Sequence, residues 1–182
     1  RANYTLPDGQ TLPIDFAIDG AGRCDITMTW QGEKTELPEF GLLFPLRREL
    51  TEVSYLGLGP RETTADRTAG GKMGAWSYNV RQDFAQNTPV YPQECGSRTG
   101  VYRADLTGAI PGICFAGDSM TFSALPYTPH ELENARHLYE LPRDDNKTVV
   151  RCAAFQRGVG GDNSWGAKPH ADDCFAVEKG TS

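Results

Sequence analysis

The stretch Leu12-Pro-Ile14-Asp-Phe16-Ala-Ile18 places an apolar residue at every second position, and Cys24-Asp-Ile26-Thr-Met28-Thr-Trp30 repeats the pattern. Successive side chains of a strand point to opposite faces, so this alternation predicts two strands with one buried face. The Asp-Gly-Ala-Gly segment between them, residues 19–22, is typical of a turn. Together these residues predict an antiparallel hairpin with Trp30 in the core.

Strand-like runs continue along the chain at residues 41–46, 52–58, 101–106, 119–124, 147–155 and 172–178. One helix is well signalled. Thr128 is a suitable N-cap, Pro129 suits the first helical position, and Glu131 completes a capping box. Tyr127 and Leu132 occupy the positions of a hydrophobic staple. We expect this helix to end near Tyr139 and to serve as a short surface connector.

The chain has 182 residues, including 20 glycines and 12 prolines. Residues 57–100 contain few periodic apolar residues, so we expect a long irregular region there, of the kind that forms functional loops or interfaces. No repeat or linker divides the sequence. It therefore predicts one all-β domain over residues 1–182, a large antiparallel β-sandwich with long loops.

Charge and cysteine content narrow the class of protein. The net charge is −6 and no basic cluster occurs, which argues against nucleic-acid binding. No apolar run approaches the length of a membrane span. The five cysteines never form Cys-x-x-Cys, so neither a zinc ribbon nor a closed disulfide framework is supported. Cys24 and Cys152 occupy apolar phases of strands, which favours small buried thiols in a reducing compartment. The alternative is one disulfide with three free thiols.

Sites with local chemical signatures are few. The glycines at 57–59 and 158–161 precede no helix, which argues against a phosphate loop. His130 and His137 fall on the predicted helix, and His170 beside Asp172 and Asp173 is either a cation ligand or an ordinary polar loop residue. No Gly-x-Ser-x-Gly nucleophile motif occurs. The local sequence does not identify a pair of carboxylates that could serve as the acid and the nucleophile of a glycosidase.

Trp165 is the most informative single residue, because it lies in a loop rich in glycine, Asp162, Asn163 and serine. An exposed indole covers the apolar C–H face of a sugar while neighbouring amides and carboxylates bind its hydroxyls. The alternative is an indole that anchors its loop in the core. Trp76, in the region expected to be irregular, supports neither interpretation.

Four segments in the same order resemble family 2 β-galactosidases. They are Ser54-Tyr-Leu-Gly-Leu-Gly-Pro-Arg-Glu62 with Asp66-Arg67, Pro92-Gln-Glu-Cys-Gly96 with Arg98, Pro126-Tyr-Thr128 with Glu131, Leu132, Ala135 and His137, and Gly160-Gly-Asp-Asn-Ser-Trp-Gly166 with Pro169-His170. Together they resemble the C-terminal small-chain domain of a lactase-type enzyme. Tyr55, Thr64, Cys95 and Asn163 depart from residues usual in these motifs.

The resemblance implies a supersandwich of the galactose-mutarotase-like type, here truncated at both ends. It implies packing against a catalytic (β/α)8 barrel that carries both catalytic glutamates and the Mg²⁺ and Na⁺ sites. This chain itself would hold no catalytic residue, cofactor or metal. It would place Trp165, with Asp162 and Asn163 beside it, against the leaving sugar of a galactoside. The family-motif loop would comprise Gly57, Gly59, Pro60, Glu62, Asp66 and Arg67.

The resemblance also implies a homo-oligomeric parent enzyme of the bacterial cytoplasm, with no nucleic-acid or membrane partner. A periplasmic or secreted enzyme is the alternative. Two other interpretations stay open. The first is a free-standing carbohydrate-binding module that uses the same exposed Trp. The second is an independent sugar-processing enzyme such as a mutarotase, which needs a positioned acid and base, typically His and a carboxylate.

Overall fold

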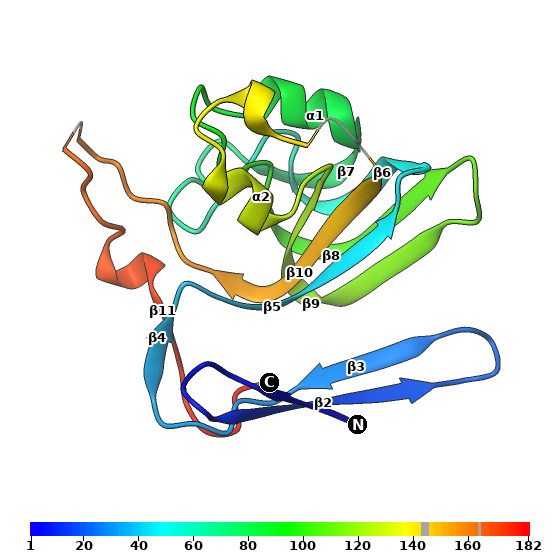
Figure 1. The fold of residues 1–182 in the computed structure, drawn as a ribbon, viewed down its shortest axis with the longest axis vertical. Coiled ribbons are helices and arrows are strands. Elements are labelled where there is room, and N and C mark those ends of the chain that lie inside the picture. Colours follow the sequence, from blue (N-terminus) through cyan, green and yellow to red (C-terminus); the bar gives the residue numbers. More distant parts are fainter. Residues whose placement is uncertain (143–145, 164) are drawn as a thin grey trace. The chain divides into compact units, whose positions relative to one another are not determined.

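The computed structural model describes residues 1–142, 146–163 and 165–182. Contacts divide these residues into two compact units, Arg1–Pro38 with Cys174–Ser182 and Glu39–Asp173. Both units are built from antiparallel sheets (Figure 1). The predicted all-β class is confirmed, and the architecture is consistent with a sandwich.

The first unit contains the hairpin predicted at the start of the sequence. Its predicted buried face is incomplete, because Ile14 is buried while Phe16 and Ile18 are exposed. Strands β1 (Ala2–Thr5), β2 (Thr11–Ile18) and β3 (Cys24–Met28) form a sheet in that order. A two-stranded sheet pairs β4 (Thr35–Leu37) with β11 (Phe175–Val177). Trp30 is buried as predicted, and its backbone N–H donates to Thr181 O at 2.8 Å. The prediction of a buried Cys24 is wrong, because Cys24 pairs with the exposed Ile18 next to the turn of the hairpin.

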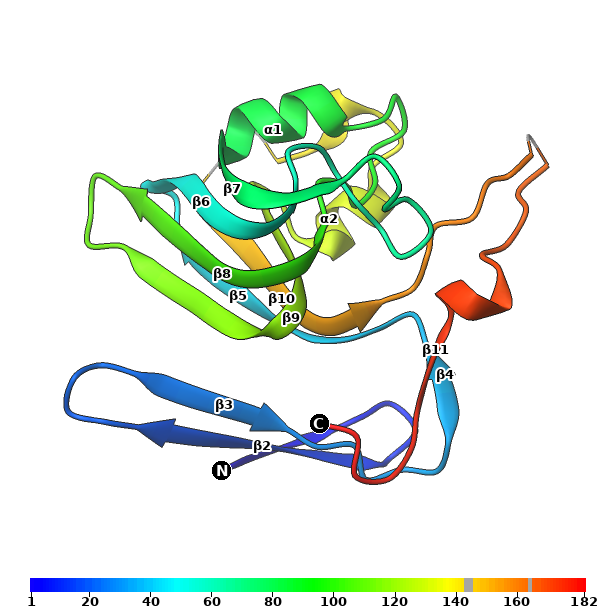
Figure 2. The same ribbon diagram turned by 180° about the vertical axis from the view of Figure 1, so that it is seen from behind.

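The second unit is a six-stranded sheet in the order β5-β10-β9-β8-β6-β7. Its strands are β5 (Glu39–Arg47), β6 (Leu50–Gly59), β7 (Lys72–Asn79), β8 (Arg98–Gly108), β9 (Ile113–Leu125) and β10 (Lys147–Gln156). The sheet curves around its own core, as Figure 2 shows from behind. Phe44 from one edge strand and Tyr78 from the other therefore pack against the same buried cluster as Val53 and Phe122. Cys152 also packs against this cluster, as predicted.

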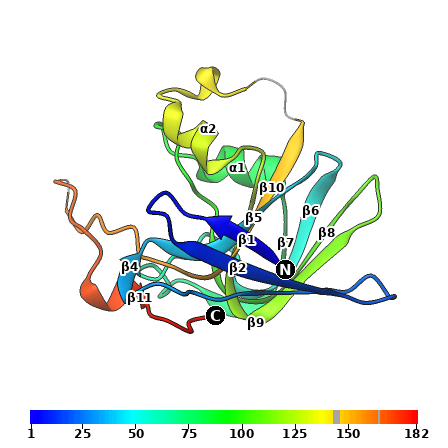
Figure 3. The same ribbon diagram turned by 60° about the horizontal axis from the view of Figure 1, so that its bottom comes forward.

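Two helices lie side by side at one end of this sheet (Figure 3), α1 (Val80–Asn87) and α2 (Pro129–Asn134). Phe84 of α1 and Leu132 of α2 belong to a second apolar cluster, which Leu125 of β9 and Tyr127 join. The predicted capping box is present. The Glu131 N–H donates to Thr128 Oγ1 at 3.2 Å, and the Thr128 N–H donates to Glu131 Oε2 at 2.8 Å.

Helix α2 is shorter than predicted. It ends at Asn134, because Ala135 adopts an extended conformation with φ −89° and ψ 130° and is buried in the second cluster. A separate 3-10 turn follows at Leu138–Glu140. His137 therefore lies outside the helix, and it stacks on Tyr139 at a ring-centroid distance of 5.0 Å instead of facing His130.

The prediction of a long irregular region at 57–100 is also wrong. Strand β7 and helix α1 both lie inside it. Trp76 pairs with Tyr55 across β6 and β7 and packs against the first core. The alternation of β7 is weak because this edge strand is rich in small residues, and α1 is only eight residues long. No helix among the described residues is both long and apolar enough to span a membrane.

Candidate functional site

The loop that carries Trp165 leaves β10 and runs to a 3-10 turn at Ala171–Asp173. It projects from the sheet as the orange-to-red segment of Figures 1 and 2. The Gly158 N–H donates to Asp173 O at 2.9 Å, and the Gly161 N–H donates to Ala167 O at 2.8 Å. Gly160 has φ 70°, and a Cβ there would lie 2.3 Å from Ala167 O. Position 160 therefore needs a glycine where the two sides of the loop approach each other. We call residues 157–173 the Trp loop.

Trp165 lies near the middle of the Trp loop in sequence, and 92% of its surface is exposed. Its backbone N–H donates to Asn163 Oδ1 at 2.8 Å, so the Asn163 side chain supports the turn. The indole is not an anchor in the apolar core, which was the alternative left open by the sequence. An apolar ring of this size in full solvent is available to a ligand or to another part of an enzyme.

Asp162 and His170 form an ion pair across the Trp loop, through Asp162 Oδ2 and His170 Nε2. The hydrogen bond and charge of Asp162, with smaller contributions from Asp173 and Asp172, raise the pKa of His170 above its ordinary value. Within residues 1–142, 146–163 and 165–182, no group of three or more His, Cys, Asp or Glu side chains could hold a metal ion. The Asp162–His170 ion pair, which we call the clip, links two parts of the Trp loop.

Asp66 joins the Trp loop to the sheet. Its Oδ2 accepts the Gly160 N–H at 2.6 Å, and its Oδ1 accepts the Thr64 hydroxyl at 2.7 Å. Burial raises the pKa of Asp66, but hydrogen bonds from Thr64, Gly160 and Val159 outweigh it and bring the pKa below its ordinary value. This carboxylate is therefore charged at neutral pH and bridges two segments 94 residues apart.

The other residues of the family-motif loop hold the surrounding backbone. A Cβ on Gly57 would lie 2.8 Å from Val101 Cγ2, and one on Gly59 would lie 2.2 Å from Tyr55 Oη. Glu62 accepts the Gly96 N–H through its Oε2. Pro60 O accepts from Arg98 at 3.4 Å, and Arg67 is exposed while its N–H donates to Thr64 O at 2.9 Å. These residues close-pack β6 on β8 and tie the first motif to the second.

A buried ion pair lies beneath the second motif. Arg98 donates to both carboxylate oxygens of Asp83, at 2.6 and 2.7 Å, and covers the Tyr78 ring at 4.4 Å. The side chains of Arg98 and Asp83 are only 1% and 9% exposed. The pair joins β8 to α1, an element that sequence reasoning missed. The signal available was Asn79 as an N-cap before apolar residues at positions 80 and 84.

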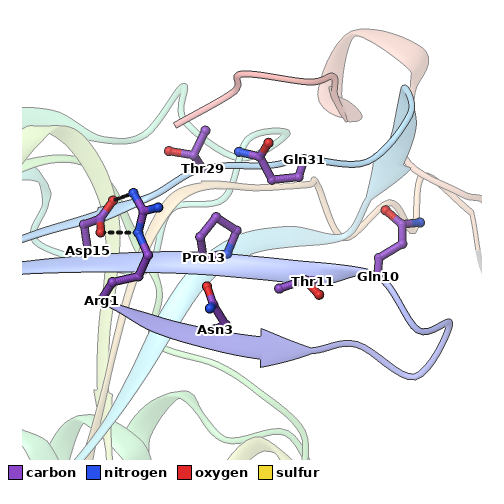
Figure 4. Close-up of a pocket in the computed structure, with 8 residues that line it drawn as sticks. All are labelled: Arg1, Asn3, Gln10, Thr11, Pro13, Asp15, Thr29 and Gln31. Carbon is purple, nitrogen blue, oxygen red and sulfur yellow. Dashed lines mark hydrogen bonds and ion pairs between the residues drawn. The ribbon is translucent and has the colours of Figure 1, made fainter.

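Two further places in the fold bring charged side chains together. Glu39 and Glu94 both pair with the buried Arg151, so a guanidinium separates these carboxylates and they do not form an acid–nucleophile pair. A hollow on the three-stranded sheet is lined by Asn3, Gln10, Thr11, Pro13, Thr29 and Gln31. Arg1 and Asp15 bind each other at one end of it at 2.7 Å (Figure 4), which neutralises its charged groups.

The fold and site define a class, an all-β domain that presents an exposed indole on a loop held by polar contacts. The family model of the β-galactosidase small chain matches residues 1–181. The chain belongs to that family.

The relatives are similar over most of this chain. A β-galactosidase of Lactobacillus delbrueckii subsp. bulgaricus is 38% identical, over 98% of this chain and 18% of the relative. A β-galactosidase of Halalkalibacterium halodurans is 34% identical, over 92% of this chain and 17% of the relative. A β-galactosidase small subunit of Latilactobacillus sakei is 35% identical, over 86% of this chain and 52% of the relative. The chain thus spans less than a fifth of the long relatives and about half of the small subunit.

Proposed function

We propose that this chain is a non-catalytic part of a retaining β-galactosidase and supplies Trp165 to the aglycone side of the active site. The observation that carries the proposal is the 92% exposed indole on the Trp loop, in a chain of the small-chain family. The substrate would be a terminal β-galactoside such as lactose. In that case glucose is the aglycone that stacks on the indole.

The catalytic groups would come from the rest of the enzyme. Retaining cleavage needs two carboxyl groups about 5–5.5 Å apart, one as nucleophile and one as acid and base. The long relatives extend well beyond the part matched by this chain, which leaves room for a (β/α)8 barrel. That barrel would carry both glutamates and the Mg²⁺ and Na⁺ ions. The parent enzyme would be a homo-oligomer.

The role of the indole follows from its surface. The C–H face of a pyranose is apolar and stacks on an aromatic ring, while its hydroxyls stay free for water or polar groups. Such a contact contributes about 1 kcal/mol. Asp162 and Asn163 precede Trp165 in the same loop and are exposed, and they would bind hydroxyls of the stacked sugar.

The first test is Trp165→Ala in the intact enzyme. We expect the concentration of glucose acceptor needed for half-maximal galactosyl transfer to rise about fivefold, which corresponds to ~1 kcal/mol of lost stacking. Formation of the galactosyl-enzyme from an activated aryl galactoside should change less than about twofold, because an activated leaving group needs little help from aglycone binding. Steady-state and burst kinetics with added acceptor measure both quantities.

Two control variants accompany this test. Trp165→Phe keeps an aromatic face and should recover most of the acceptor affinity. Val159→Ala removes another exposed apolar side chain from the same loop and should leave the acceptor step unchanged. An unaltered acceptor requirement in Trp165→Ala would contradict the proposed role.

A further inference from the structure

The Trp loop needs an external hold if Trp165 is to present a fixed face. Its internal bonds, Gly161 to Ala167 and Asp162 to His170, shape the loop but do not attach it to the sheet. The Gly158–Asp173 bond only closes its base. The bond from Gly160 to Asp66 has a different role, because it connects the loop to a segment that follows β6.

Asp66 follows two threonines that are held by hydrogen bonds in and next to β8. Thr63 and Thr64 are both buried. The Thr63 N–H donates to Ser97 O at 2.8 Å, and the Thr99 N–H donates to Thr63 Oγ1 at 2.9 Å. Strand β8 therefore fixes Thr63, and the Thr64 hydroxyl then orients the carboxylate of Asp66.

The fit between Asp66 and the loop is close on both sides. Gly158 is buried against the carboxylate, and a Cβ on Gly158 would lie 2.6 Å from Asp66 Cγ and Oδ2. The bond to the Gly160 N–H is short and has an ionised acceptor, which makes it stronger than a neutral bond. A longer side chain at position 66 would collide with Gly158, and a shorter one would leave Gly160 without its acceptor.

We propose that Asp66 is the positioning residue of Trp165, since it fixes the Trp loop to the threonine segment held by β8 and so sets where the indole is held. The inference rests on the proposed function for its catalytic consequence only. Asp66 touches neither the indole nor a sugar and acts through Gly160. The loop should be ordered with Asp66 intact and should detach at Gly158–Gly161 when the carboxylate is removed.

The test uses hydrogen exchange of the intact enzyme together with the acceptor kinetics. Asp66→Ala should speed exchange of the Gly160 amide about tenfold, because loss of a bond to a charged acceptor exposes the donor. It should also raise the acceptor requirement about as much as Trp165→Ala does. The double variant Asp66→Ala with Trp165→Ala should add little to either single variant, because both act on one interaction.

Asp66→Asn is the conservative variant. Its amide oxygen still accepts the Gly160 N–H and its amide nitrogen donates to the Thr64 hydroxyl, so exchange should stay within about threefold of the wild type. Gly158→Ala perturbs the same contact from the loop side and should reproduce Asp66→Ala, which keeps the test decisive if that variant fails to fold. Asp105→Ala removes a carboxylate that pairs with Arg103 on β8, and it should change neither readout.

The outcomes separate the two proposals. Unchanged exchange at Gly160 in both Asp66→Ala and Gly158→Ala overturns the anchoring role. Faster exchange with an unchanged acceptor step, while Trp165→Ala weakens that step, overturns the positioning role. If Trp165→Ala itself has no effect, the proposed function fails, and the exchange data alone then decide whether Asp66 anchors the loop.

Discussion

Trp165 and the pair Asp162–His170 lie on one loop, and the exposed indole depends on polar contacts instead of apolar packing. His170 and Asp162 are 69% and 62% exposed at their side chains. Solvent and salt therefore screen their attraction. A pair of this kind shapes a loop without adding much to global stability.

The clip should respond to pH. Asp162 raises the pKa of His170, and Asp173 and Asp172 add to the effect. The ionic contact is therefore complete below the unperturbed pKa of histidine and is lost as pH rises through the raised pKa in the folded chain. We expect amide exchange in the Trp loop, corrected for its intrinsic pH dependence, to quicken above that pKa.

The measurement is an NMR titration of His170, with Asp162→Asn as the comparison. The substitution should lower the His170 midpoint, and added salt should reduce the difference between the two proteins. A midpoint that is the same in both proteins would show that Asp162 does not set the charge of His170.

At the level of elements, α1 illustrates how a short helix is held. Asn79 caps it by accepting the Arg81 and Gln82 N–H groups at 3.1 and 3.2 Å. Eight residues are too few to be stable alone, so packing must supply most of the stability. Phe84 enters the second core, and Asp83 pairs with Arg98 on β8.

Removing one partner of this buried pair should be costly. Asp83→Ala leaves the guanidinium of Arg98 buried without its carboxylate, and we expect a loss of about 3–5 kcal/mol in the free energy of unfolding. Asp105→Ala breaks the exposed Arg103 pair and should cost less than about 1 kcal/mol. Urea denaturation followed by circular dichroism compares the two. Equal losses would mean that the buried pair does not hold α1 on the sheet.

At the scale of the whole molecule, the chain is a small share of its long relatives, and its exposed indole faces solvent. One ring on a projecting loop covers a single face of a sugar and does not enclose it. A pocket that binds a small ligand well covers most of the ligand surface. We therefore expect the chain by itself to bind a free sugar too weakly for a free-standing carbohydrate-binding module.

Calorimetry tests this conclusion. Titration of the chain alone with galactose, glucose or lactose should give no measurable heat of binding, while the intact enzyme, as a positive control, should bind. Micromolar affinity in the chain alone, abolished by Trp165→Ala, would instead support a free-standing module.

Sequence patterns predicted what is local in this protein. Alternation identified the hairpin at 12–28 and most strands of the six-stranded sheet, and the capping box marked the start of α2. Those patterns failed where the local signal is weak, in β7 and α1, and where a helix end depends on packing, at Ala135. The motifs also indicated the family, which a model matching residues 1–181 now shows.

What the sequence alone determined is most strands of the six-stranded sheet, the start of α2 and the family to which the chain belongs. The tertiary structure decided which distant groups meet. Asp66 reaches Gly160 across 94 residues, Glu62 reaches Gly96 across 34, and Asp83 reaches Arg98 across 15. Side-chain periodicity depends on neighbouring residues only, whereas these contacts depend on which strands pair and how the sheet curves, so only the folded chain brings them together.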